Sequence, residues 1–189
     1  MKKISNILAG TDFSESSQDG LAEALRIARD TGANLTILHV VDTELANHVE
    51  RATNLSMAEI LDHASDRLVK YLDDILGSDH GARVEALIGC PFVEILRAAK
   101  THAVDLLVLG SGGSEMDGVH AGVLARRCVR KVPAMVLLVR ERLNQPFRSV
   151  VACVDFSDNS NEAVELAAQV ANQDGADLHL LHVARPVVP

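Results

Sequence analysis

The chain has 189 residues, and its 26 Asp+Glu against 18 Lys+Arg give a formal net charge of −8 at pH 7. This acidic balance argues against binding to nucleic acid or to an anionic membrane, because both require clustered Lys and Arg. Without Trp and with a single Tyr, the chain also lacks the aromatic rings on which unpaired bases stack. No apolar run approaches the ~20 residues of a membrane-spanning helix, and no export signal is present, so we expect a cytoplasmic protein.

The length fits one complete domain and a remainder. A domain of roughly 100–150 residues leaves a remainder of roughly 40–50 residues, which is too few to bury a second independent core. The strands and helices predicted along the chain indicate what this remainder is.

The first forty residues predict one βαβ unit. Residues 4–9 and 35–41 are short apolar runs typical of strands. Between them, apolar side chains recur at helical spacing at Leu21, Ala24, Leu25 and Ala28. Ser14 or Ser16 can cap the start of this helix, and Gly32 stands where a left-handed residue ends it.

The next hundred residues continue the alternation of strand and helix. The patterns predict an amphipathic helix at 54–76, a strand at 83–88, a helix after Gly89-Cys90-Pro91, a buried strand at 106–109, a helix at 123–130 and a strand at 134–139. Five strands alternating with helices predict an α/β domain with a doubly wound, parallel, five-stranded, Rossmann-like sheet over residues 1–141.

The opening pattern then returns. From Asp12 to Asp155 is a step of 143 positions, and the same step carries residues 12–14 (Asp-Phe-Ser) onto 155–157 and residues 38–40 (Leu-His-Val) onto 181–183 without a gap. We therefore expect a linker at 142–148 and, at 149–189, the first βαβ unit of an incomplete second copy.

Such a unit leaves a sheet edge unpaired and apolar faces uncovered. The first domain, a dimer mate or an exchanged segment would have to cover them.

Two loops stand where a doubly wound sheet binds ligands, beyond the carboxyl ends of its strands. One holds Gly10, Thr11 and Asp12, and the other is the Gly-rich stretch 110–118, with Gly122 at the start of the next helix. Glycines let backbone N–H groups approach a phosphate, and a helix N-terminus adds partial positive charge. The Gly-rich stretch is either a phosphate cradle or a flexible surface loop.

Five short motifs together carry a family resemblance. They are residues 11–14 (Thr-Asp-Phe-Ser), 38–40 (Leu-His-Val), 89–91 (Gly-Cys-Pro), 105–110 (Asp-Leu-Leu-Val-Leu-Gly) and 132–133 (Val-Pro). On these motifs the chain resembles the universal stress proteins over the whole of residues 1–141. The resemblance implies a fold of the adenine-nucleotide alpha-hydrolase type, dimerisation through the last strand of the first domain and, in one branch of the family, ATP in the crevice.

The ATP-binding branch has the pattern Gly, two residues, Gly, nine residues, Gly, then Ser or Thr. Gly110 and Gly113 match its first part, but only eight residues separate Gly113 from Gly122, and Val123 stands in place of the hydroxyl. A lost hydrogen bond to a charged group lowers affinity about one to two decades. The departures therefore leave either weak ATP binding or none.

The resemblance also carries over particular positions. Asp12 would contact the adenosine, Val41 would offer backbone groups to adenine, and the glycines at 110, 113 and 122 would face the phosphates. Mg²⁺ would enter only together with ATP. No catalytic residue and no resident metal ligand are assigned.

The three cysteines lack zinc or disulfide spacing. Cys90 lies near the crevice, where it is either a redox thiol or a small residue in a tight turn. Cys128 and Cys153 stand in apolar patterns, so we expect both in a core. His39 and His182 occupy equivalent positions of the repeat, which predicts a structural role for them.

A basic run over residues 126–131 holds Arg126, Arg127, Arg130 and Lys131, and predicts a solvated helix face more readily than a polyphosphate site.

The sequence leads to a stress-response regulator of universal stress type that binds an adenine nucleotide. Two alternatives stay open. One is a slow ATP-hydrolysing enzyme using the same crevice, and the other is a ligand-free protein that acts by dimerisation, through the last strand of the first domain or through the C-terminal βαβ unit.

Overall fold

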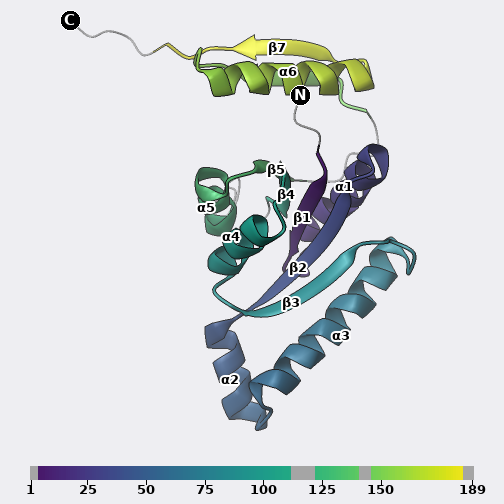
Figure 1. Ribbon diagram of the computed structural model, residues 1–189, viewed down its shortest axis with the longest axis vertical. Coiled ribbons are helices and arrows are strands. Elements are labelled where there is room, and N and C mark those ends of the chain that lie inside the picture. The colour runs from purple at the N-terminus through teal and green to yellow at the C-terminus, as the bar shows by residue number, and fades with distance from the viewer. Residues whose placement is uncertain (1–3, 112–121, 141–145, 185–189) are drawn as a thin grey trace, which may run out of the picture. The chain divides into compact units, whose positions relative to one another are not determined.

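A computed structural model of the chain describes residues 4–111, 122–140 and 146–184. The chain divides into two compact units, the N-terminal unit of residues 1–142 and the C-terminal unit of residues 143–189. Each unit is described by itself (Figure 1).

The N-terminal unit is built on a parallel five-stranded sheet in the order β3-β2-β1-β4-β5. Its elements are β1 (Asn6–Thr11), α1 (Glu15–Thr31), β2 (Asn34–Asp42), α2 (Thr43–Thr53), α3 (Met57–Leu76), β3 (Arg83–Gly89), α4 (Pro91–Thr101), β4 (Leu106–Gly110), α5 (Val123–Lys131) and β5 (Met135–Val139). The sequence prediction of a doubly wound α/β sheet is confirmed.

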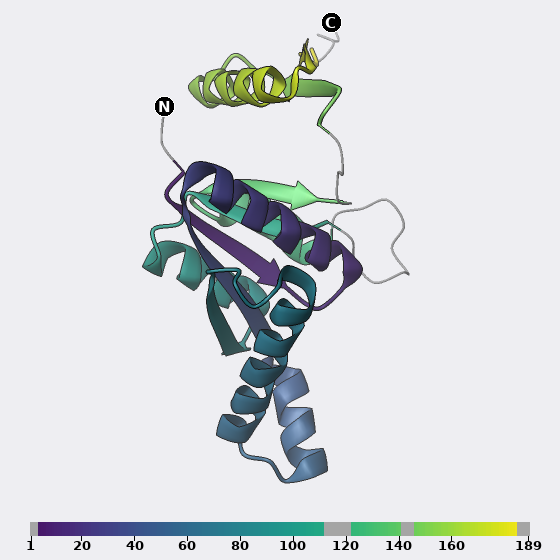
Figure 2. The same cartoon turned by 90° about the vertical axis from the view of Figure 1, so that its right-hand side faces the viewer.

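Helices cover both faces of this sheet, as Figure 2 shows for α1. On one face, α1 and α3 bury strand side chains such as Ile7 and Ile37, and on the other, α4 and α5 bury Leu8 and Leu38. Neighbouring strand residues point to opposite faces, so the continuous apolar runs of β1, β2 and β4 reflect burial on both sides.

One helix of the N-terminal unit has no counterpart in the sequence prediction. The structure ends β2 directly in α2, whose first turn is capped by Asp42 accepting from the backbone N–H of Glu44 at 2.8 Å. Asn54, expected to start the following helix, instead ends α2 in the left-handed conformation. The next helix, α3, begins after Ser56, which forms a capping box with Glu59.

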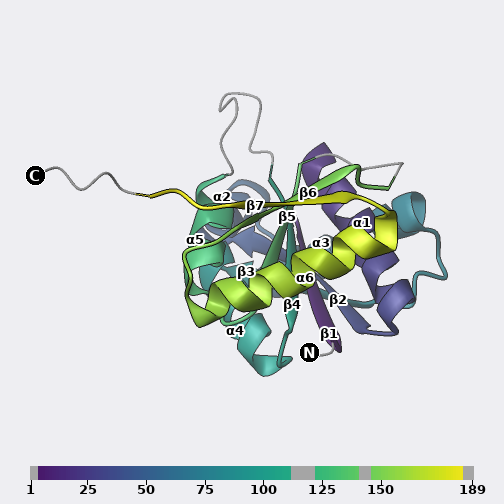
Figure 3. The same ribbon diagram turned by 90° about the horizontal axis from the view of Figure 1, so that it is seen from above.

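The C-terminal unit is one βαβ motif, in which β6 (Ser149–Cys153) and β7 (Asp177–Leu181) pair in parallel and α6 (Asp158–Asp174) packs against both strands. Figure 3 shows α6 alongside the two strands. Ser157 caps the helix and Gly175 ends it in the left-handed conformation, just as Ser14 and Gly32 do for α1.

The prediction that both Cys128 and Cys153 lie in a core is half wrong. Cys128 is fully buried between α5 and the sheet, but Cys153 is exposed. Its apolar surroundings in the sequence belong to a strand face that the C-terminal unit does not cover.

The part of the chain that the structure describes contains no helix both long and apolar enough to cross a membrane.

Candidate functional site

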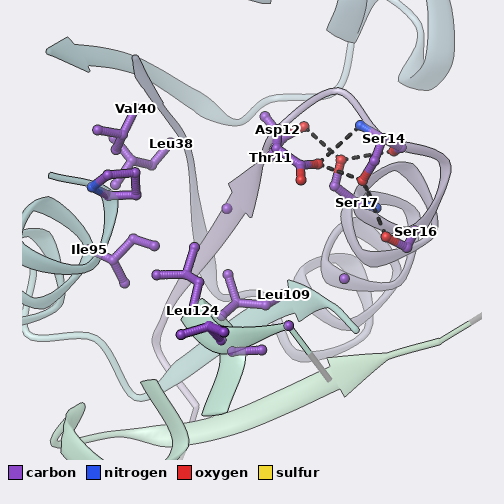
Figure 4. Close-up of a pocket in the computed structure, with 16 residues that line it drawn as sticks. Thr11, Asp12, Ser14, Ser16, Ser17, Leu38, Val40, Ile95, Leu109 and Leu124 are labelled. Carbon is purple, nitrogen blue, oxygen red and sulfur yellow. Dashed lines mark hydrogen bonds between the residues drawn. The ribbon is translucent and has the colours of Figure 1, made fainter. Parts of the chain in front are cut away.

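A cavity of about 350 Å³ opens at the carboxyl ends of β1 and β4, where the chain order of the strands reverses. Figure 4 shows that hydroxyl and carboxylate groups from β1 and α1 form one wall and apolar side chains form the other. The polar wall consists of Thr11, Asp12, Ser14, Ser16 and Ser17. The apolar wall includes Leu38, Val40, Ile95, Leu109 and Leu124. Ligands in open α/β sheets bind at this place.

The carboxylate of Asp12 is held by the turn that starts α1. Its Oδ1 accepts from the backbone N–H of Ser14 at 3.0 Å and from the Ser14 hydroxyl at 2.5 Å. Burial by itself would raise the pKa of Asp12, but the hydrogen bonds to its carboxylate, of which those from Ser14 are the strongest, together outweigh burial and hold the pKa below its ordinary value. Asp12 therefore offers a negative charge to the cavity at neutral pH.

Thr11 and Ser17 support the turn from behind. Both side chains are buried and lie 3.1 Å apart, oxygen to oxygen. Ser17 donates its hydroxyl to the carbonyl of Ser14 at 2.9 Å, and the Thr11 hydroxyl accepts from the backbone N–H of Phe13 at 3.1 Å. These hydroxyls satisfy one another and the backbone, so their main role is to fix the turn.

Phe13 occupies the left-handed region with φ of 66°, which is uncommon for a bulky residue. Its ring packs between His39, with centroids 4.4 Å apart, and Tyr71, at 5.0 Å. The guanidinium of Arg67 lies 4.3 Å from the ring centroid. These contacts anchor the turn to β2 and α3.

His39 ties the end of β1 to β2, because its Nδ1–H donates to the Thr11 carbonyl at 2.9 Å. Its pKa is lowered mainly by burial, against the opposing effect of this hydrogen bond. The structural role predicted for His39 is confirmed.

The start of α5 forms the far end of the cavity. Gly122 is its N-cap and carries no capping side chain, and no acidic residue stands in the first turn. The first N–H groups of a helix lack intrahelical acceptors and carry partial positive charge. Among the described residues, the N-terminus of α5 with its partial positive charge therefore lies beside the cavity.

The glycines at the two loops have different reasons to be small. A Cβ on Gly110 would lie 2.5 Å from the backbone carbonyl of Ser16, so Gly110 is needed for α1 to cross β4. A Cβ on Gly122 would meet nothing within 4 Å. Gly113, with the rest of the Gly-rich stretch from 112 to 121, lies outside the described residues.

Val41 is placed differently from the other candidate residues. Its side chain is buried with Ala46 and Ile60, on the side where α2 and α3 pack, while its neighbour Val40 lines the cavity. A contact of Val41 with a ligand would therefore have to use its backbone, as the family resemblance implies.

Two further predicted candidates, Cys90 and the basic run of α5, lie outside the cavity lining. Cys90 is the exposed N-cap of α4, next to Pro91 in the cavity wall. The basic run of α5 is exposed, and Arg127 places its guanidinium 4.2 Å from the centre of the Phe92 ring. Among the described residues, no three His, Cys, Asp or Glu side chains are grouped to hold a metal ion.

The apolar wall went unrecognised in the sequence, because Leu38, Val40 and Ile95 fit the patterns of buried strands and helices. For the two strand residues, the alternation along β2 was the available signal, because it places Leu38 and Val40 on one face of the sheet.

The universal stress protein family model matches the chain twice, at residues 3–140 and 146–189. The chain belongs to the universal stress protein family. Its second match covers the C-terminal unit, in line with the internal repeat.

Curated relatives agree with this assignment. The chain is 26% identical over 161 residues to a putative universal stress protein of Staphylococcus haemolyticus, covering 82% of this chain and 97% of that protein. It is 25% identical over 135 residues to a universal stress protein A family protein of Schizosaccharomyces pombe, of which the chain spans only 42%.

Solved structures of universal stress proteins share the fold. Universal stress protein UspA from Lactobacillus plantarum is 30% identical, with a TM-score of 0.60, covering 74% of this chain and all of that one. A universal stress protein from Archaeoglobus fulgidus matches 97% of this chain and 69% of its own, with 21% identity and a TM-score of 0.65. That second likeness spans both units and shows the fold alone.

Proposed function

We propose that this universal stress protein is a cytoplasmic regulator of the stress response that binds an adenine nucleotide in the cavity between β1 and β4. The observation that carries the proposal is the pairing, around one cavity, of the ionised Asp12 carboxylate and the open N-terminus of α5. A nucleotide offers the matching groups, because its ribose donates hydroxyls and its phosphate is an anion.

Two solved relatives support this choice of ligand. One is described as a universal stress protein in complex with cAMP, at 24% identity and a TM-score of 0.50. The other is the universal stress protein from Archaeoglobus fulgidus in complex with dAMP, at 19% identity and a TM-score of 0.50. Those ligands were bound by those two proteins, and at these sequence identities their likeness to this chain is a likeness of fold alone.

Each part of the nucleotide would have its own contacts in the cavity. Asp12 would accept hydrogen bonds from the ribose hydroxyls. The apolar side chains of Leu38, Val40 and Ile95 would contact the base, with the backbone of Val41 nearby. The first N–H groups after Gly122 would bind the phosphate.

Among adenine nucleotides, we expect AMP or cAMP to bind at least as tightly as ATP. Val123 cannot donate to a terminal phosphate as the Ser or Thr of the ATP-binding branch would. If ATP does bind, Mg²⁺ would accompany it as a partner of the phosphates.

We further propose that the chain dimerises through β5, the last strand of the N-terminal sheet. β5 pairs only with β4 among the described strands, which leaves one edge open to a second β5. This is the arrangement that the family resemblance implies.

The test compares equivalent aspartates of the two units. Asp155 makes the same bonds to Ser157, at 3.0 and 2.6 Å, as Asp12 makes to Ser14, but it lines no described cavity. Calorimetric titration with AMP, cAMP and ATP should show binding, weakened about 10- to 100-fold by Asp12→Asn and unchanged by Asp155→Asn.

Nucleotide released from the denatured protein, identified by mass spectrometry, would name the natural ligand. No released nucleotide and no heat at millimolar concentrations would reject nucleotide binding. Equal effects of the two substitutions would show that the cavity is the wrong site.

A further inference from the structure

A second cavity, of about 330 Å³, opens at the amino ends of β1, β2 and β3. We call it the edge cavity and define it by its polar side chains, those of Asn6, Asn34, Thr36, Arg83 and His102. The cavity proposed for the nucleotide lies at the carboxyl ends of β1 and β4. The two cavities therefore lie at opposite edges of one parallel sheet.

Polar groups line the edge cavity on the face of the sheet that α4 covers. Thr36 stands two positions before Leu38 on β2, so both side chains point to that face. Arg83 pairs with Thr36 across the strands and shares the face. The two apolar side chains of the lining, Ile7 and Leu35, belong to the core on the other face. The described lining therefore offers hydrogen-bonding groups and no apolar surface for a base.

A largely buried acid holds the two basic side chains of the edge cavity in place. The side chain of Glu85 is 18% exposed and is not part of the lining. Its carboxylate lies 2.8 Å from Nε of Arg83 and 3.3 Å from Nε2 of His102. An ion pair through Nε keeps the terminal amino groups of a guanidinium available to other acceptors. Arg83 is therefore a cation fixed from behind, as supporting residues fix the groups of a binding site.

Thr36 adds a buried hydroxyl to the edge cavity. The residue is 8% exposed and lines the cavity, and among the described residues its hydroxyl has no hydrogen-bond partner. Buried hydroxyls normally have one, because a buried polar group without a partner costs free energy. A polar molecule in the edge cavity would supply that partner.

The two asparagines of the edge cavity are held by a chain of hydrogen bonds. Asn34 donates its side-chain N–H to Oδ1 of Asn6 at 3.1 Å. Asn6 in turn donates to the carbonyl of Ala103, just beyond α4, at 3.3 Å. Because a side-chain amide has two N–H groups and a carbonyl oxygen, Asn34 keeps further hydrogen-bonding capacity at a fixed place.

These groups together indicate the chemistry of a ligand. A guanidinium binds a carboxylate through two parallel hydrogen bonds, and hydroxyl and amide groups bind the hydroxyls of a ligand. We propose that the edge cavity binds a small hydroxylated carboxylate, with Arg83 on its carboxylate and Thr36 and Asn34 on its hydroxyls. This binding is independent of the nucleotide and uses a different edge of the sheet.

Other ligand classes fit the edge cavity less well. A second nucleotide would find no apolar surface for its base, and a metal ion would find no carboxylate in the described lining. Glu85 already balances part of the charge of Arg83. A phosphate dianion would therefore be less well neutralised than the single charge of a carboxylate.

An NMR titration of the full-length chain measures this binding. The probe is glycerate, a small hydroxylated carboxylate, and its uncharged counterpart is glyceramide. The backbone N–H of Gly81 and the side-chain N–H groups of Asn6 and Asn34 report from the cavity. Glycerate should shift these signals until they saturate, and glyceramide should bind at least ~10-fold more weakly, because it forms no ion pair.

The variant Arg83→Gln tests the cation and should weaken glycerate binding ~10- to 100-fold. The matched control is Arg97→Gln on α4. The side chains of both arginines are 68% exposed, and Arg97 is also paired with an acid, Glu94, at 2.9 Å. Because Arg97 lines neither cavity, its substitution should leave glycerate binding unchanged.

The variant Thr36→Val tests the hydroxyl and keeps the branched shape of the side chain. Since the hydroxyl has no partner within the described chain, the substitution should not lower the urea midpoint of unfolding. It should weaken glycerate binding about 3- to 10-fold. A loss of stability without a loss of binding would contradict the role given to Thr36.

The proposal is overturned if glycerate at tens of millimolar shifts none of the three reporters, or if Arg83→Gln and Arg97→Gln bind it alike. Equal binding of glyceramide would reject recognition of a carboxylate. Inorganic phosphate that binds as tightly as glycerate would reject a carboxylate site in favour of a general anion site. AMP added to the glycerate-saturated chain should leave the reporters in place, and displacement of glycerate would put it in the nucleotide cavity instead.

Discussion

The two units of this universal stress protein build the same turn in different surroundings. Phe13 and Phe156 share a φ of 66°, and each ring packs against a histidine, with centroids 4.4 and 4.6 Å apart. The histidines donate to the end of the preceding strand at 2.9 Å in one unit and 2.8 Å in the other. Yet Phe156 is 77% exposed, while Phe13 is packed against α3.

This comparison separates local from tertiary causes. The turn forms identically with and without α3, so hydrogen bonds between near neighbours and to the second strand suffice to produce it. The cavity requires more, because β4, α4 and α5 supply its apolar wall and its helix N-terminus. The C-terminal unit thus repeats the turn without the described cavity.

The largest expected difference is in the stability effect of truncating equivalent side chains in β1 and β6, the first strands of the two units. Leu8→Ala should lower the free energy of unfolding of the N-terminal unit by about 2–5 kcal/mol, since it opens a hole in a closed core. Val151→Ala, at the equivalent exposed position, should change stability by less than about 0.5 kcal/mol in dilute solution. Urea unfolding of both variants, resolved by hydrogen exchange of each unit, makes the measurement. Equal losses would mean that the two strands are equally buried.

The contact between α1 and β4 provides the next test. Gly110→Ala should destabilise the N-terminal unit by about 1–3 kcal/mol or more, because the added Cβ lies 2.5 Å from backbone atoms of Ser16. Gly122→Ala adds a Cβ in open space and should cost less than about 1 kcal/mol. Thermal unfolding followed by circular dichroism compares the two. A neutral Gly110→Ala would show that α1 does not depend on this close approach.

The helix caps should respond alike in the two units. Ser14 accepts from the backbone N–H of Ser17 at 3.2 Å, and Ser157 accepts from that of Ser160 at 3.3 Å. Replacing either cap by Ala should cost about 1 kcal/mol, visible as faster hydrogen exchange in the first turn of α1 or α6. A clear inequality would reject the view that this turn is locally determined.

The smallest expected effect is a pH dependence from His39. Burial lowers its pKa below the ordinary value near 6.5, so the unfolded chain takes up the proton more readily than the folded one. The contribution to stability is complete above pH 6.5 and is lost as the pH falls through the lower pKa of the folded state. Urea midpoints from pH 7.5 to 5 should fall for the parent and fall less for His39→Gln, and parallel curves would contradict the prediction.

Much of the fold was predictable because it is written in short-range patterns. The runs of β1, β2 and β4 are apolar on both faces, and α1 repeats apolar residues at helical spacing. The helix α2 escaped prediction, since it buries only Ala46 among its side chains and therefore shows no strong apolar period.

The site was predictable in part. Asp12 and Gly122 were predicted at this edge of the sheet and both line the cavity, because loops after parallel strands gather at one edge. The apolar wall was not, because pattern alone cannot tell a side chain in a core from one that lines a cavity. The prediction that Cys153 is buried was wrong for the same reason, because an apolar position in a strand is buried only when another element covers it.

The sequence by itself determined the local structure of this protein: the repeated turn, the helix caps and the order of strands and helices, all of which depend on residues near one another in the chain. Only the tertiary structure decided which apolar faces are buried and where a cavity remains. Burial is a property of the elements that arrive from elsewhere in the chain, and the same βαβ pattern is a closed core in one unit and an open face in the other.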